Sequence, residues 1–169
     1  MVIKSKLVFE GREYGIEYHD ADTFEGLPVE RITQAYGICF CGGKLLVARR
    51  AKNGAWGHLG GHTEAGEAPE QTLQREIQEE SNMEVVAYQP IGYQVVTNPG
   101  GDRHIQLRYC CTVRPLGEFV RDPALHERGG IDAIQLIDPA GYRRYVDWGG
   151  VGDRLMSRAL GCGLNLAVA

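Results

Sequence analysis

The sequence has no long apolar run and no excess of positive charge. A membrane-spanning helix needs about eighteen consecutive apolar residues. The 169-residue sequence contains no such stretch. The N-terminus also has no continuous apolar segment of the kind found in signal peptides. The formal net charge is -4, so the chain has no basic field that would attract duplex nucleic acid. We therefore expect a cytoplasmic protein that binds neither a membrane nor duplex nucleic acid.

Cysteines are few, and their spacing matches no zinc site. The five are Cys39, Cys41, Cys110, Cys111 and Cys162, without a C-x-x-C pair or a paired histidine spacing. A redox pair within 39–41 or 110–111 is disfavoured, because neighbouring strand residues point to opposite faces of a sheet. We expect reduced, partly buried thiols.

The composition indicates one main folded domain. Hydrophobic residues make up 43% and charged residues 24% of the chain, as in ordinary soluble globular proteins. The length suits a single core, and no internal repeat or Pro/Ser-rich linker divides it. We expect an N-terminal hairpin or arm over residues 1–30, the main domain over 31–148, and a C-terminal helix and tail over 149–169 packed on that domain.

The hydrophobic pattern predicts a mixed order of strands and helices. Leu73 and Ile77 lie one turn apart, Pro69 suits a first helical turn and Asn82 a helix end, so a helix is predicted over 68–81. A second helix is predicted over residues 151–160. The predicted strands are two short ones around Gly11 within 7–18, a hairpin of 32–41 and 44–49 joined by Gly42-Gly43, and 84–97, 103–113 and 131–137.

Three glutamates share one face of the first predicted helix. At about 100° per residue, Glu76, Glu79 and Glu80 fall within an arc of about 100°. Repulsion among their carboxylates costs stability, and a hard divalent cation would turn that repulsion into attraction. Oxygen ligands completed by substrate phosphates suit Mg²⁺ or Mn²⁺.

The residues around this acidic face also suit a phosphate site. Gly60, Gly61 and Gly66 let the backbone turn tightly, which can bring a main-chain carbonyl or amide close to a metal or phosphate. Arg75 can orient a neighbouring carboxylate or contact phosphate. The segment therefore predicts a metal-assisted phosphate chemistry.

The spacing of these residues resembles the Nudix box. The matching positions are, in order, Gly61, Glu67, Arg75-Glu76-Ile77, Glu79-Glu80 and Asn82-Met83. Two positions depart from the family pattern. Asn82 stands where the family has glycine, and asparagine is the residue next best able to adopt a left-handed helix end. Leu59 stands where many members have proline, which affects the expected path of the loop.

The resemblance implies a fold and a metal-dependent activity. Its fold is an α/β/α sandwich with a mixed β-sheet. Glu76, Glu79, Glu80 and the carbonyl of Gly60 would hold Mg²⁺, with Mn²⁺ as an alternative, and Arg75 would support those glutamates. The metal would polarise a phosphoryl oxygen and help generate hydroxide for attack on phosphorus. The implied catalytic residues are Glu76, Glu79 and Arg75.

The sequence leaves alternatives for the general base and for the residues that contact the substrate. Members of the family use either a box glutamate or one from a downstream loop, so Glu76 and Glu79 are joined by two further candidates, Glu118 and Glu127. Candidate substrate-binding residues are Arg50, Trp56 and Glu64. Aromatic and histidine side chains that could contact a base or phosphate, or equally belong to the core or rim, are Tyr36, Tyr88, Tyr93, His58, His62 and His104.

The predicted function is a Mg²⁺-dependent pyrophosphohydrolase acting on a nucleoside diphosphate derivative. ADP-ribose-like compounds, nucleotide sugars, nucleoside triphosphates, dinucleoside polyphosphates and capped RNA all remain open as substrates. Pro99 resembles a feature of the ADP-ribose pyrophosphatase branch, but residues 98–101 equally form a hairpin turn. The alternatives are a nucleotide-binding regulatory module without hydrolysis and an isomerase of allylic diphosphates. We expect a homodimer, because the N-terminal hairpin offers a free strand edge.

Overall fold

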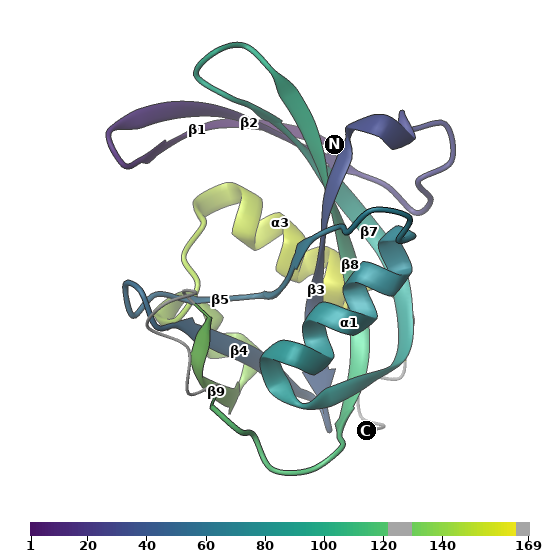
Figure 1. Cartoon of the computed structure of the whole chain (residues 1–169). Helices are drawn as coiled ribbons and strands as arrows, with labels where there is room; N and C mark the ends of the chain where they lie inside the picture. Colours follow the sequence, from purple (N-terminus) through teal and green to yellow (C-terminus); the bar gives the residue numbers. More distant parts are fainter. Residues whose placement is uncertain (122–129, 165–169) are drawn as a thin grey trace.

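A mixed β-sheet with helices packed against it forms the centre of the computed structural model, which describes residues 1–121 and 130–164 (Figure 1). The helices are α1 (Pro69–Ser81) and α3 (Gly149–Leu160), and two short 3-10 turns are η1 (Val29–Arg31) and η2 (Pro139–Arg144). The strands are β1 (Val2–Phe9), β2 (Arg12–Asp20), β3 (Ile32–Cys41), β4 (Lys44–Arg50), β5 (Trp56–Gly57), β6 (Leu59–His62), β7 (Met83–Thr97), β8 (Arg103–Pro115) and β9 (Ile131–Ile137).

The strand order is β1-β2-β7-β8-β3-β4-β5, with β6 paired to β3 and β9 paired to β4. The pair of β3 and β8 is parallel, whereas the other strand pairs are antiparallel. The sheet is therefore mixed, as the resemblance to the Nudix box implies.

The two faces of the sheet pack against different helices. On β3, Ile38 and Phe40 belong to the cluster that includes α3, whereas Ala35 and Cys39 belong to the cluster that includes α1. This alternation follows from the two-residue period of a strand. It gives the α/β/α arrangement that was expected. It also sends Cys110 and Cys111 to opposite faces, and Cys110 lies instead beside Cys162 of the C-terminal segment, with 2.7 Å between the sulfur atoms.

The N-terminal hairpin continues the main sheet. Glu10 and Gly11 form its turn with positive φ angles of 50° and 74°. Residues Gly15–Asp20 of β2 pair with Gly92–Thr97 of β7, and Tyr18 is fully buried against Ile91, whose carbonyl accepts its hydroxyl hydrogen bond at 3.0 Å. The distal part of β1 and β2 projects away from the remaining strands, over the N-terminal end of α3 (Figure 1).

Helix α1 has the limits and the packing that its sequence predicts. Leu73 and Ile77 are fully buried, and Asn82 ends the helix in the left-handed conformation with φ 55° and ψ 37°. The Asn82 side-chain amide donates a hydrogen bond to the carbonyl of Glu118 at 2.9 Å. Asparagine thus occupies the glycine position of the box without distorting the helix end.

The short strands β5 and β6 are absent from the sequence prediction, because they are two and four residues long and β6 contains two glycines. Strand β7 continues through Pro90, as the predicted strand over 84–97 does, and its pairing with β8 shifts at Val85/Ala87 and Pro90/Gly92. No helix among the described residues is long and apolar enough to cross a membrane.

The left-handed residue at the end of α1 gives a testable prediction. Asn82→Ala should lower the free energy of unfolding by about 1–2 kcal/mol, because alanine pays the left-handed penalty and loses the bond to Glu118. Asn82→Gly loses the bond but fits the conformation, so its loss should stay below about 1 kcal/mol. Urea denaturation measures both. Equal losses for the two variants would show that the backbone conformation does not matter.

Candidate active site

Helix α1 presents three carboxylates beside the glycine pair of β6. The main-chain N–H of Gly60 donates to Glu80 Oε2 at 3.3 Å. A Cβ atom added to Gly61 would lie 2.6 Å from the carboxyl group of Glu76, so only glycine leaves room for that side chain. Gly60 has φ 146°, and a Cβ atom there would lie 2.2 Å from the carbonyl oxygen of Ala35. The glycine pair therefore lets the acidic helix face pack close to the sheet.

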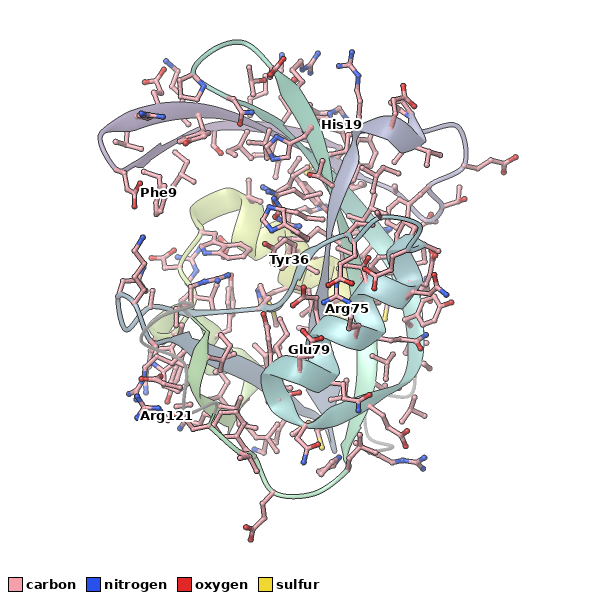
Figure 2. All side chains as sticks on the ribbon, in the orientation of Figure 1. Phe9, His19, Tyr36, Arg75, Glu79 and Arg121 are labelled. Atoms are coloured by element: carbon pink, nitrogen blue, oxygen red, sulfur yellow. The ribbon has the colours of Figure 1, made fainter. Side chains whose placement is uncertain are left out.

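Arg75 connects the acidic residues to one another and to the loop before the helix. Its guanidinium donates to Glu67 at 2.7 and 2.9 Å, to Glu76 at 3.0 Å and to Glu79 at 3.3 Å. It also donates to the carbonyl of His62 at 3.0 Å. Arg75 and Glu79 both project from α1 (Figure 2). The arrangement is that of a residue that positions carboxylates and reduces the repulsion among them.

Glu67 joins the loop to the helix. Its carboxylate accepts hydrogen bonds from Thr72 Oγ1 at 2.6 Å and from the main-chain N–H of Glu64 at 3.1 Å. Hydrogen bonds from Arg75, reinforced by the one from Thr72, lower the pKa of Glu67 to about 2. Glu67 therefore carries its negative charge throughout the physiological pH range.

Glu80 is the carboxylate whose charge is least compensated. Burial first, and then the neighbouring charges of Glu76 and Glu79, raise its pKa to about 8, although the Gly60 N–H and Arg50 act in the opposite direction. A partly buried carboxylate beside two others lacks positive charge, and hard oxygen donors are the ligands that Mg²⁺ and Mn²⁺ prefer. The donor set therefore fits a divalent cation. No three acidic, histidine or cysteine side chains of residues 1–121 and 130–164 form a ready-made metal cluster.

A cavity of about 850 Å³ lies beside this acidic site, between the N-terminal hairpin and the body of the protein. Residues from four regions line it, including Phe9 of β1, Tyr36 of β3, Arg50 of β4 and Trp148 just before α3. Phe9 lies at the tip of the hairpin and Tyr36 near the centre of the molecule, on the side of Arg75 (Figure 2). Tyr36 of the lining pairs with Gly60 across β3 and β6, so the cavity lies next to the glycine pair on which the acidic helix face packs.

Of the three predicted substrate-binding residues, one lines the cavity and two do not. Arg50 lines the cavity and is close enough to Glu80 to act on its pKa. Trp56 packs edge-to-face on Tyr145 with ring centroids 5.5 Å apart and against the α3-side core, so it does not line the cavity. The side chain of Glu64 is 71% exposed and lies 3.9 Å from Arg75, also away from the cavity lining.

Of the other aromatic and histidine candidates, some line the cavity and the others lie elsewhere. Tyr36, His58 and His62 line the cavity. Tyr88 packs edge-to-face on a buried tyrosine and Tyr93 stacks on a histidine, so both have partners within the fold. His104 is likewise absent from the cavity lining.

The two downstream candidates for the general base have different outcomes. Glu118 is exposed in the segment after β8, and its main-chain carbonyl is held by Asn82 at the C-terminal end of α1. Glu127 lies outside the described residues. The general base therefore stays a prediction.

Sequence reasoning missed the polar floor of the cavity. Arg108, Gln94 and Gln106 line it and lie within long strands that otherwise contribute to the core. The available signal was Arg108 itself, a charged residue placed between the apolar Leu107 and Tyr109. A charged side chain at such a position needs hydrogen-bond partners, which the sequence alone does not identify.

The depressed pKa of Glu67 predicts a pH-dependent contribution to stability. A lowered carboxyl pKa stabilises the fold at pH values above the unfolded value, 4.5, and this stabilisation is lost as the pH falls toward about 2. Glu67→Gln should therefore lower the Tm at pH 7, and its Tm should converge with that of the wild type near pH 2. Thermal unfolding followed by circular dichroism measures this. Glu64→Gln, at a mostly exposed neighbour, is the control, and an equal effect of the two variants would contradict the role of Glu67.

Comparisons with known proteins agree with the fold and identify the family. The family model described as "NUDIX domain" matches residues 31–150. No curated protein sequence matches the chain. The structure of the Bacillus subtilis pyrophosphohydrolase BsRppH is similar with a TM-score of 0.70 at 14% identity, covering 95% of this chain and 98% of that one. A NUDIX hydrolase from Nitrosomonas europaea is similar with a TM-score of 0.61 at 15% identity, covering 78% and 90%.

The family model alone spans more than half of the chain and contains the whole box. The structural likeness to BsRppH extends beyond that model, so it includes parts of the N-terminal hairpin or the C-terminal helix. The family that the sequence predicts is confirmed: the chain belongs to the NUDIX domain family and is a Nudix hydrolase.

Proposed function

We propose that the chain is a Mg²⁺-dependent pyrophosphohydrolase that cleaves the diphosphate linkage of a nucleoside diphosphate derivative. The observation that carries the proposal is the acidic face of α1, which packs on the glycine pair of β6 where a nucleotide-sized cavity begins. An ADP-ribose-like compound, a nucleotide sugar or a nucleoside triphosphate would place its diphosphate at the carboxylates and its remaining part in the cavity.

The chain's own residues have distinct roles in this proposal. Glu76, Glu79, Glu80 and the carbonyl of Gly60 would hold the cation. Bound Mg²⁺ or Mn²⁺ would supply charge stabilisation at a phosphoryl oxygen and lower the pKa of water. Arg75 fixes two of these carboxylates in place. Arg50, at the boundary between the cavity and the acidic site, would contact a phosphate of the substrate.

We assign the general base to Glu79 rather than Glu76. The Glu79 side chain is 59% exposed, and among residues 1–121 and 130–164 its one hydrogen-bond partner is Arg75, at 3.3 Å. The Glu76 side chain is 17% exposed and is confined between Arg75 and Gly61. Glu79 therefore has the freedom to accept a proton from the attacking water, whereas Glu76 suits a fixed ligand position.

Four further properties of the protein remain predictions. These are the homodimer formed through the β1 edge, the cytoplasmic location, the lack of duplex nucleic acid binding and the limits of the three segments 1–30, 31–148 and 149–169. Light scattering coupled to gel filtration would decide the first of them.

The roles of the glutamates predict the effect of matched substitutions. Glu79→Gln should lower kcat by about 10²-fold or more, because a general base contributes about 10²–10⁴-fold. Glu80→Gln should raise the Mg²⁺ concentration needed for half-maximal rate, since an amide is a weaker ligand for a hard cation. Steady-state kinetics with titrated Mg²⁺ measures both effects.

Glu70→Gln is the control on the same helix. Glu70 accepts a hydrogen bond from Tyr109 at 2.9 Å, which an amide oxygen can also accept, and it points away from the acidic face. It should keep wild-type kinetics. If Glu70→Gln lost as much activity as Glu79→Gln, the assignment of Glu79 would be wrong.

The reaction itself is tested by a product-mass screen of nucleoside diphosphate derivatives with Mg²⁺, Mn²⁺ or EDTA. Metal-dependent release of two phosphate-bearing products identifies both the reaction and the substrate. Binding of nucleotides without cleavage of any compound in the panel would replace this proposal by the regulatory-module alternative.

A further inference from the structure

Arg108 is a buried cation without an acidic partner. It lies in the middle of β8 with 4% of its surface exposed, and its guanidinium stacks over the ring of Tyr36 at 4.6 Å. It forms no ion pair with the acidic residues of 1–121 and 130–164. Burial lowers the pKa of Arg108 to about 10, so the side chain stays charged at neutral pH. A buried charge balanced only by neutral groups is costly, and such a cost points to a functional reason.

The partners of Arg108 are two glutamines. Its Nη2 donates to the amide oxygen of Gln106 at 2.8 Å and to that of Gln94, and its Nη1 donates to the Leu107 carbonyl at 3.2 Å. A guanidinium has only donors, so both glutamines must turn their oxygen atoms toward it. The NH₂ group of each amide is then turned away from Arg108. Arg108 thus fixes the orientation of two neutral hydrogen-bond donors.

These two glutamines stand side by side in the sheet. Gln94 of β7 is the register partner of Gln106 of β8, and Gln106 is in turn paired with Gln34 of β3. Side chains at directly opposed positions have Cβ atoms about 5 Å apart. All three line the cavity. The amide of Gln34 is already engaged, since its oxygen accepts from Tyr36 and its nitrogen contacts His62 at 3.2 Å.

The other charged residues of the lining are mainly cations, Lys6 and Arg50. Among the described residues that line the cavity, Asp147 is the one acid, and it already accepts from the main-chain N–H of Gly149 at 3.1 Å. His58 is 4% exposed, and its Nδ1, like the Nε of Arg108, has no hydrogen-bond partner in the described part of the chain. The described lining therefore contains buried polar atoms without partners, and its charged groups other than Asp147 are hydrogen-bond donors.

We propose that this cavity binds the base of the substrate as a 6-oxopurine, and that Gln94 and Gln106, oriented by Arg108, select against adenine. A 6-oxopurine presents two adjacent acceptors, O6 and N7, that match two neighbouring NH₂ donors. Adenine places its own NH₂ donor where the oxygen would be, so one donor would face another. The aromatic rings of Tyr36 and Trp148 line the same cavity and suit a planar base.

The inference rests on the proposed function only for placing the base beside the diphosphate site. Binding is therefore measured in EDTA, where no hydrolysis occurs, by calorimetric titration with IMP and AMP. The wild type should bind IMP at least about tenfold more tightly, since a mismatched pair of polar groups costs about 1.4 kcal/mol or more. Inosine and adenosine, which carry no phosphate, should show the same order.

Gln94→Glu and Gln106→Glu are the decisive variants. Each keeps the size of the side chain and an oxygen for Arg108, to which it adds a counter-charge, so folding should be preserved. Each replaces an NH₂ donor by an acceptor, so the IMP-to-AMP affinity ratio should fall by about tenfold or more and can invert. Gln89→Glu on the same strand is the control, because Gln89 does not line the cavity, and it should leave the ratio unchanged.

Three results would overturn the inference. The first is an equal affinity of the wild type for IMP and AMP. The second is an unchanged ratio in both glutamate variants. The third is competition by inorganic phosphate with no binding of inosine, which would make the cavity an anion site. None of them touches the proposed hydrolysis, whereas a protein that prefers IMP but cleaves no compound with Mg²⁺ contradicts the hydrolysis alone.

Discussion

The guanidinium of Arg75 is the interaction on which the acidic site depends. Glu76, Glu79 and Glu80 lie on one helix face because of the helical period, and their mutual repulsion would oppose close packing on β6. Arg75 contacts two of them and also Glu67, so a single cation offsets several negative charges. Because Glu67 is bound to the helix through Thr72 as well, the glycine loop and the helix are held together as one unit.

Electrostatics also explains why this site suits a cation although the protein as a whole is acidic. Arg75 does not contact Glu80, and burial leaves that carboxylate with a raised pKa. The fold thus compensates part of the charge and leaves part of it for a ligand. On the other side of the glycine pair the charge is positive instead of negative. Arg50 and Arg108 line the cavity there, and Asp147 is the one acid of its described lining. A substrate with a diphosphate and a polar ring would meet both environments.

The sheet connects these two environments. Strand β3 contacts β6 on one edge and β8 on the other, so Tyr36 stands opposite Gly60 on one side and Arg108 on the other. The N-terminal hairpin lines one side of the cavity because β2 pairs with β7 as well as with β1. The cavity lining and the carboxylates beside it therefore come from segments far apart along the chain, placed by strand register.

The sequence by itself determined the local features of this protein. The limits of α1, the left-handed Asn82, the β3-β4 hairpin and the three clustered glutamates follow from neighbours within a few residues, where helical and strand periods act directly. Only the tertiary structure decided which residues face the cavity. Trp56, expected to bind substrate, is packed on Tyr145, and the row of Gln34, Gln106 and Gln94 exists only through the pairing of three strands. Register between distant strands depends on the packing of the whole core, which no local pattern contains.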